Sequence, residues 1–347
     1  MSHLLTHQKA ALEQALLEAG QLIWSSSRPL LACHVSPDGD AIGSLTGLAL
    51  ALRYLGLQPM AVSPEPVPVG LHYIPGARDL TQHVDSTFDL VIALDCSDPE
   101  RLGHIVGIEG FSRVPLVNID HHLTNIYFGA VNLVDVQASS TAEIVLQLLD
   151  HMAVPLDERI STCLLAGIVT DTRGFRTSNV TIQTMEAATR LMRAGAPLTY
   201  ITRYGLDYRP TSALLLWKEA LASLQLKERV AWATVSLSMR QKAGYEGNGD
   251  AGLVDFLLSA ADADVAAVFI ERRDGYTEVG LRARPGHDVA RVAQRLGGGG
   301  HALAAGCKFP GLPEEAQAQI LPLLWDLVNT GPRSVLTACE QRYTEPQ

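Results

Sequence analysis

Acidic and histidine side chains collect in this sequence at the ends of apolar runs. Three apolar runs, at 29–35, 90–95 and 114–120, contain such residues at their ends or are followed by them, and so does the apolar stretch that ends just before 172. The residues are His34, Asp38, Asp40, Asp95, Asp120, His121, His122 and Asp171. Carboxylates mixed with imidazoles, without thiolates, suit Mn²⁺, Mg²⁺ or Fe²⁺ better than structural zinc. The residue types therefore predict a site for divalent cations.

These side chains are numerous enough to hold two ions. A carboxylate can bridge two ions roughly 3.5–4 Å apart, and the water between them becomes a nucleophile near neutral pH, which suits in-line attack on phosphorus. Each cluster alone has a plainer interpretation, since "SPDGD" is typical of a surface turn and a histidine pair often only fills a core. Together they favour cations, because so many carboxylates in one place would cost on the order of several kcal/mol in repulsion or raised pKa values.

The first half of the chain alternates short apolar runs with helical patterns. Apolar residues at helical spacing predict a helix over about 5–26, and further helices are expected after 39 and over 139–152, 158–172 and 180–195. Near-continuous apolar strands separated by helices indicate an α/β fold with a doubly wound, mainly parallel sheet. The stretch "SSTAE" at 139–143 is most simply a capped helix start, although its hydroxyls could also contact a substrate.

The predicted topology places the acidic and histidine clusters together. In an open parallel sheet, ligands bind beyond the carboxyl ends of the strands. Because three predicted strands end in these clusters, we expect the clusters to meet at one edge of the sheet. Asp171 is expected to reach the same edge from the end of the helix at 158–172.

Length and pattern both predict two domains. A chain of 347 residues exceeds the usual size of a single domain. A smaller α/β unit is expected from strands at 230–237, 264–271 and 276–284 and helices at 250–260, 288–296 and 313–329. We therefore expect a metal-binding catalytic domain at 1–195, a helical connector at 196–228, a substrate-binding domain at 229–330 and a tail at 331–347.

A glycine run, "RLGGGGHALAAG" at 295–306, is the second candidate site. Glycines let the backbone approach a ligand, and their free N–H groups can form an anion-binding nest. We expect His301 to open a small-residue helix whose N-terminus favours phosphate, the alternative being a flexible loop. Arg282 and Arg284 alternate on a predicted strand, so they point to one face, either as solvated arginines or as a phosphate clamp.

Composition narrows the classes of partner. The net charge of −10 argues against a long nucleic-acid track, and aromatic residues at 6% suggest no obvious stacking platform. No apolar window reaches the roughly 18 residues of a membrane span, and the N-terminus lacks the basic region of a secretory signal. Five scattered cysteines without a C-x-x-C pair favour reduced thiols and hence a cytoplasmic protein.

In this combination of motifs the sequence resembles the DHH phosphoesterase family. The first four motifs of that family are matched by "HVSPDGDAIGS", "LDCSD", "DHH" at 120–122 and "GIVTDTRGF". The run "GGGGHALAAG" resembles the nucleotide-binding signature of its DHH-associated C-terminal domain. The resemblance covers most of residues 20–310, with the motifs in the family's order.

The resemblance implies a two-manganese site, with magnesium as the alternative, in a cleft between the two domains. It assigns His34, Asp38 and Asp95 to one ion and Asp40, Asp95, His121 and Asp171 to the other, so that Asp95 bridges. His122 would contact the scissile phosphate, and Asp120 would orient its neighbours. The terminal phosphate or nucleotide of the substrate would lie against Arg282, Gly299, Gly300 and His301.

Within the family, the two-domain layout is similar to the NrnA-type members, which degrade RNA of a few nucleotides and remove the 3′-phosphate of 3′-phosphoadenosine 5′-phosphate (pAp). The expected substrates are therefore short oligonucleotides, linear dinucleotides or pAp, with no membrane and no long duplex as partner. A homodimer is expected only by resemblance. RecJ-like single-strand exonuclease activity, inorganic pyrophosphatase activity and a non-catalytic nucleotide sensor are the alternatives, and the sequence does not rank the candidate substrates.

Overall fold

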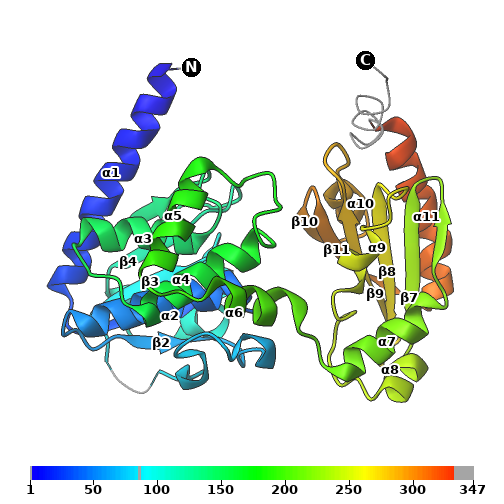
Figure 1. Cartoon of the computed structure of the whole chain (residues 1–347), viewed down its shortest axis with the longest axis horizontal. Coiled ribbons are helices and arrows are strands. Elements are labelled where there is room, and N and C mark those ends of the chain that lie inside the picture. The colour runs from blue at the N-terminus through cyan, green and yellow to red at the C-terminus, as the bar shows by residue number, and fades with distance from the viewer. Residues whose placement is uncertain (1, 85–86, 332–347) are drawn as a thin grey trace. The chain divides into compact units, whose positions relative to one another are not determined.

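The computed structural model describes residues 2–84 and 87–331 and separates the chain into two units (Figure 1). The first unit is Met1–Tyr208 and the second is Arg209–Gln347. The finer division predicted at 195, 228 and 330 stays a prediction. The tail expected at 331–347 lies, apart from Gly331, outside the described residues.

The first unit is built on a parallel sheet of five strands in the order β2-β1-β3-β4-β5. The strands are β1 (Pro29–Cys33), β2 (Met60–Val62), β3 (Leu90–Leu94), β4 (Leu116–Asp120) and β5 (Val131–Val134). This confirms the predicted parallel α/β fold and adds β2 and β5, which are too short to stand out in the sequence.

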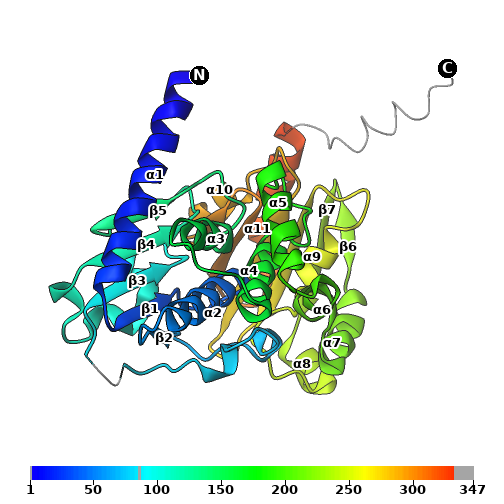
Figure 2. The same cartoon turned by 60° about the vertical axis from the view of Figure 1, so that its left-hand side comes forward.

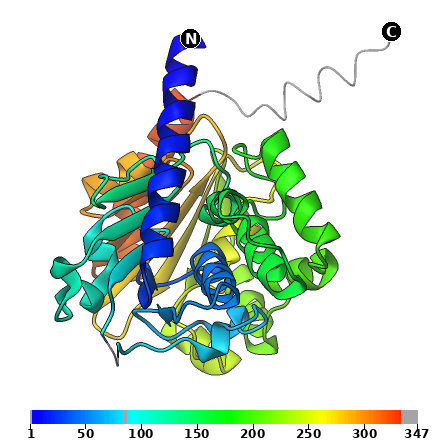
Figure 3. The ribbon, with the colours of Figure 1, turned by 90° about the vertical axis from the view of Figure 1, so that its left-hand side faces the viewer.

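Helices account for most of the remaining first unit. The α-helices are α1 (Ser2–Ser25), α2 (Gly39–Tyr54), α3 (Thr141–His151), α4 (Glu158–Asp171), α5 (Ile182–Arg193) and α6 (Leu198–Thr202). The shorter helical turns are η1 (Val69–Leu71), η2 (Ala77–Asp79), η3 (Pro99–Gly107), η4 (Phe111–Arg113) and the π-helical η5 (Arg203–Asp207). α1 lies alongside the sheet, and its N-terminal end projects beyond it (Figure 3).

The two faces of the first sheet have different covers. Alternate residues of β1 point to opposite faces, so Leu31 and Cys33 join the core formed with α1 to α6. Leu30 and Ala32 join a smaller core with η3 and η4. The doubly covered sheet that the apolar runs predicted is therefore present, with 3₁₀ turns in place of α-helices on its second face.

Small residues bring α2 and α4 close together on the helical face (Figure 2). A Cβ atom at Gly43 would lie 2.5 Å from the carbonyl oxygen of Cys163, and one at Gly167 would lie 2.7 Å from Cβ of Ala142 in α3. The close packing of these two helices matters for function, because both α2 and α4 carry residues of the predicted metal site.

The second unit contains a mixed sheet of six strands in the order β10-β11-β9-β8-β7-β6. Its strands are β6 (Gln225–Lys227), β7 (Val230–Val235), β8 (Val265–Glu271), β9 (Tyr276–Ala283), β10 (Gly299–His301) and β11 (Ala304–Pro310). Its helices are α7 (Thr211–Leu221), α8 (Leu237–Ala243), α9 (Leu253–Leu257), α10 (Val289–Arg295) and α11 (Pro313–Thr330). Ala267 and Phe269 of β8 pack towards α10 and α11, and Val268 and Ile270 pack towards α7 and α9.

Two further sequence expectations agree with the described residues. Cys33, Cys96, Cys163 and Cys307 are buried free thiols, whereas Cys339 lies outside the described range. Over residues 2–84 and 87–331, every helix is too short or too polar to cross a lipid bilayer.

Candidate active site

The carboxyl edge of the first sheet collects the predicted ligands. His34 directly follows β1, Asp95 directly follows β3, and Asp120 ends β4 with His121 and His122 next along the chain. The strand order reverses between β1 and β3, and such a switch point is where α/β sheets bind ligands.

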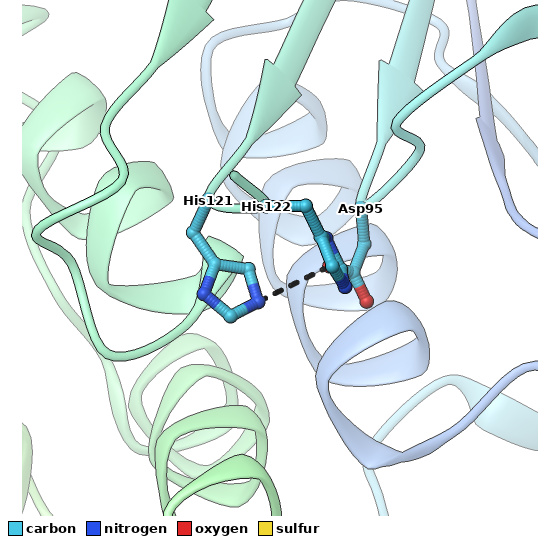
Figure 4. A group of neighbouring side chains, drawn as sticks. All are labelled: Asp95, His121 and His122. Carbon is cyan, nitrogen blue, oxygen red and sulfur yellow. Dashed lines mark ion pairs between the residues drawn. The ribbon is translucent and has the colours of Figure 1, made fainter. Parts of the chain in front are cut away.

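Asp95 lies at the centre of this edge, within reach of the imidazoles of His34, His121 and His122. Figure 4 shows Asp95 with two of them, His121 and His122. Its Oδ2 is 3.4 Å from Nε2 of His34, and its Oδ1 is 3.7 Å from Nε2 of His121 and 3.6 Å from Nδ1 of His122. The Asp95 backbone has a φ of 61°, in the left-handed region that is strained for a residue with a side chain and is found most often at functional sites.

The other three predicted acids approach the same imidazoles from helices. Asp38, the N-cap of α2, has its Oδ1 3.9 Å from Nε2 of His34. Asp40 in the first turn of α2 and Asp171 at the end of α4 have oxygens 4.0 and 3.9 Å from Nε2 of His121. All the residues predicted as metal ligands are thus brought together.

Asp95 is also oriented by a hydroxyl. The Thr141 Oγ1 donates a hydrogen bond of 2.9 Å to Oδ1 of Asp95, and both residues are buried. Thr141 is the first residue of α3 and follows the N-cap Ser140. The sequence predicted the cap correctly, but it gave no sign that the neighbouring hydroxyl fixes a carboxylate across the sheet.

Asp40 is held by the N-terminus of α3. Its two oxygens accept hydrogen bonds of 2.6 and 3.0 Å from the backbone N–H groups of Thr141 and Ala142. The positive end of the helix dipole favours a carboxylate there. Gly167 of α4 makes room for it, because a Cβ at that position would lie 2.6 Å from Oδ1 of Asp40.

Asp120 holds His122 rather than facing the other carboxylates. Its Oδ1 is 2.7 Å from Nδ1 of His122, and its Oδ2 accepts a 2.6 Å hydrogen bond from Nδ2 of Asn125. Asn125 also donates to the side chain of Asn118, which is fully buried within β4. A carboxylate oxygen accepts hydrogen bonds, so this contact favours the tautomer of a neutral His122 ring that carries its proton on Nδ1.

Charge at the centre is balanced unevenly. Burial raises the pKa of Asp95, but the hydrogen bond to His34 and the charges of His121 and His122 outweigh it and hold that pKa well below its usual range. Burial lowers the pKa of His122, but the hydrogen bond to Asp120 and the charges of the nearby carboxylates outweigh burial and raise that pKa to about 9.

For the carboxylates around this centre, compensation by neighbouring groups is incomplete. Burial, followed by the charges of Asp95, Asp171 and Asp38, raises the pKa of Asp40 well above its ordinary value. Burial, together with the charges of Asp95 and Asp38, outweighs the lowering effect of His121 and His122 and raises the pKa of Asp171 to about 6. Divalent cations would remove this repulsion, so the electrostatics fit a metal site.

The donor set also fits metal ions. Among the described residues, two groups of three offer ligand atoms that all lie within 4.8 Å of one another: Asp95 with His121 and His122, and His34 with Asp38 and Asp95. Asp95 belongs to both groups, and no cysteine belongs to either. The site can therefore hold divalent cations through oxygen and imidazole nitrogen atoms.

The glycine run in the second unit has a different structure from the one predicted. Gly299–His301 form β10, which pairs antiparallel with β11 and matches His301 with Ala304. The helix expected after His301 was therefore wrong, because small residues carry weak local preferences and pairing with β9 decides their conformation. Free backbone N–H groups at a helix N-terminus cannot be part of this site.

Arg282 lies two strands from His301, since it is paired with Ala304 on β11. Its guanidinium forms a 3.0 Å ion pair with Asp255, and it lines a cavity of about 520 Å³ together with Gly297 and Gly298. Gly299, Gly300 and His301 do not line that cavity. Arg284 instead donates to the carbonyl oxygens of Ala260 and Ala261.

Comparison with known proteins agrees with these features. The N-terminal domain model of the DHH family matches residues 30–168, and the DHHA1 domain model matches residues 229–330. The bifunctional oligoribonuclease and PAP phosphatase NrnA of Thermus thermophilus is 34% identical over 298 residues, which are 84% of this chain and 87% of that protein. The Bacillus subtilis protein of the same name is 28% identical over 81% of this chain and 88% of its own length.

A solved structure shares the fold. An exopolyphosphatase-related protein from Bacteroides fragilis superimposes with a TM-score of 0.85 at 23% identity, covering 91% of this chain and 98% of that one. The two matched domains, and the identity shared along almost the whole Thermus thermophilus protein, show that this chain belongs to the DHH family.

Proposed function

We propose that this protein is a Mn²⁺-dependent phosphohydrolase that degrades short oligonucleotides and linear dinucleotides to mononucleotides and removes the 3′-phosphate of pAp. The observation that carries the proposal is that three histidines surround Asp95 and three further carboxylates lie against two of these histidines. The names of the two relatives, both oligoribonucleases and PAP phosphatases, support this choice of substrates. Mg²⁺ is the alternative ion.

The proposed ligands divide around Asp95. His34, Asp38 and Asp95 would hold one ion, and Asp40, Asp95, His121 and Asp171 would hold the other. Bound ions would neutralise the scissile phosphate and supply an activated water for attack on phosphorus. The hydrogen bond from Thr141 keeps Asp95 aligned between the two ligand groups.

The neighbouring residues have supporting roles in this proposal. Asp120 fixes the tautomer and ring orientation of His122, which would contact the scissile phosphate and assist the leaving oxygen. Arg282, Gly299, Gly300 and His301 would hold the far end of the substrate. The cleft between the domains, the cytoplasmic location and the homodimer remain predictions from the sequence.

The test is a panel of substrates with the purified protein and Mn²⁺. It would run from pAp through RNA of two to about twenty nucleotides, with pyrophosphate as an added substrate, and it would be read by product and chain length. We expect mononucleotides from the shortest RNAs, phosphate from pAp, and turnover that falls as the chain grows. Turnover that rises with length, or phosphate release from pyrophosphate alone, would contradict the proposal.

A further inference from the structure

Three tyrosines recur at every fourth residue along α6, η5 and the residue that follows η5. The ring centroids of Tyr200 and Tyr204 are 4.5 Å apart, and those of Tyr204 and Tyr208 are 4.8 Å apart. Tyr73, which follows η1, lies 6.1 Å from Tyr200 and 6.0 Å from Tyr204. We call these four residues the tyrosine row.

The outer rings of the row are open to solvent. Tyr200, Tyr204 and Tyr208 are 42, 40 and 57% exposed, whereas Tyr73 packs against the core of the first unit. Tyr73 therefore supports the row from within and stacks at 30° to Tyr204. A row of touching aromatic rings on a surface is the form that single-strand binding sites take, because every base has a face to stack.

The helix that carries the row packs against the end of α4, where Asp171 lies. A Cβ at Gly205 would lie 3.2 Å from Cγ2 of Thr170, the residue before Asp171. Thr170 also contacts the first turn of α2, since a Cβ at Gly39 would lie 2.7 Å from Cβ of Thr170. The row is thus joined to the candidate active site through Thr170, within the first unit.

A second contact joins the row to the loop after Asp171. A Cβ at Gly174 would lie 3.0 Å from Cδ1 of Leu206 in η5. That loop carries Arg173 and Arg176 on the surface, and the guanidinium of Arg203 lies 6.0 Å from the ring centroid of Tyr208. Exposed arginines beside aromatic rings supply the positive charge that a phosphate backbone requires.

The local backbone is unusual as well. η5 is a π-helix, a form that is rare in proteins and frequent at functional sites. A residue larger than glycine at 205 would place its Cβ 2.6 Å from the hydroxyl oxygen of Tyr73. The π-helix and Gly205 together allow the segment that carries Tyr204 to pack directly on Tyr73 and Thr170.

We propose that the tyrosine row stacks the bases of a single-stranded oligonucleotide whose scissile phosphate lies at Asp95. The inference rests on the proposed function and extends it, because it gives the first unit a base-binding surface of its own. pAp has one base and no further nucleotides, so its binding does not need the row. The row would therefore favour oligonucleotides over pAp.

The test compares Tyr208→Leu and Tyr200→Leu with the wild type on RNA of about five nucleotides and on pAp. Loss of one stacked base predicts a rise in KM of about tenfold for the RNA, with kcat and the KM for pAp unchanged within about twofold. Tyr208→Phe should keep the wild-type KM, because stacking needs the ring and not the hydroxyl. Tyr54→Leu, at an exposed tyrosine that ends α2, is the matched control.

A binding measurement separates this inference from the proposed function. RNA carrying 2-aminopurine should lose fluorescence on binding the wild type and keep it with Tyr208→Leu, whether or not the RNA is cleaved. Equal quenching by both proteins, or an equal rise in KM for pAp, would overturn the base-stacking role. If the wild type cleaves neither RNA nor pAp, the proposed function fails, and the quenching still decides the role of the row.

Discussion

The two candidate sites of this protein are organised in opposite ways. At the carboxyl edge of the first sheet, side chains are fixed: Asp95 and Asp40 are buried, and each accepts hydrogen bonds from α3. In the β10–β11 hairpin of the second unit, His301 is exposed and it is the glycine backbone that is confined. A Cβ at Gly300 would lie 2.5 Å from the carbonyl oxygen of Ala304.

This difference teaches what each region can do. Several buried carboxylates close together raise the free energy of the fold unless a cation neutralises them, so the first region is suited to bind positively charged metal ions. A hairpin of small residues brings little charge but permits close approach of another molecule. Substitutions should therefore act on turnover in the first region and on substrate affinity or folding in the second.

The largest effect is expected at Asp95. Asp95→Ala removes the one carboxylate shared by both ligand groups, so turnover should fall at least about a thousandfold and both ions should be lost. Steady-state kinetics and metal analysis of the purified variant would measure this. Asp98→Ala is the control, since Asp98 caps η3 and belongs to neither ligand group. Retention of two bound ions in Asp95→Ala would contradict the bridging role.

Thr141→Val tests whether the hydrogen bond to Asp95 matters. We expect metal affinity or turnover to fall by about tenfold to a hundredfold, because groups that orient metal ligands typically have effects of that size. Metal titration with kinetics would measure it, and Thr141→Ser should restore the wild-type values. Thr162→Val removes a comparable buried hydroxyl, which bonds to Glu158 instead. Equal losses in the two valine variants would reduce Thr141 to a packing role.

His301→Ala addresses the second region. If His301 holds the far end of the substrate, the variant should raise KM or lower turnover on a dinucleotide by about tenfold, and less on a generic phosphodiester dye. Kinetics on both substrates give the answer, with Leu303→Ala in the same hairpin as the control. Equal losses on the dinucleotide and the dye would remove the proposed role.

The sequence was sufficient to locate the first region and insufficient to describe how it is held. Parallel topology places strand ends at one edge, so apolar runs that end in acids predicted the convergence at Asp95. The supporting residues Thr141 and Asn125 were missed, because their hydrogen bonds cross between elements. One signal was present: Asn118 interrupts an apolar strand and Asn125 ends the same octapeptide, "NIDHHLTN".

The glycine run of the second region was recognised from its composition, but its conformation was predicted wrongly, as a helix after His301 instead of a hairpin. Glycine and alanine at 297–306 permit strand, helix and loop alike, so only pairing with β9 could decide. The tyrosine row was missed for a related reason. The overall aromatic content of 6% suggested no stacking platform, because it does not register three tyrosines spaced four residues apart or Tyr73 more than a hundred residues earlier.

Two adjacent glycines make the comparison sharper. Gly300→Ala should lower the free energy of unfolding by about 1–3 kcal/mol, because Gly300 has a φ of 132° and its Cβ would meet β11. Gly299→Ala meets nothing within 4 Å and should change stability by less than about 0.5 kcal/mol. Urea unfolding measures both. Reduced activity of a fully stable Gly299→Ala would support close approach of a substrate there, and equal stability losses would refute the account of the hairpin.

A small effect is expected at Asp89, an exposed carboxylate whose comparison with Asp40 shows what burial and neighbouring charges do. Both carboxylates accept backbone N–H groups, but Asp89 is exposed, and bonds from Ser26, Ser27 and Arg28 outweigh slight burial and lower its pKa.

A carboxyl whose pKa is lower in the folded state stabilises the fold above its unfolded pKa, and that contribution disappears as pH falls through the folded pKa. Asp89→Asn should therefore cost no more than about 1 kcal/mol near pH 7, and its stability should approach that of the wild type as pH falls below about 4, the usual unfolded value for Asp. Urea unfolding across that range measures the difference. If the two proteins differed in free energy of unfolding by the same amount at every pH, the charge of Asp89 would not stabilise the fold. Asp89 would then be no valid comparison for Asp40.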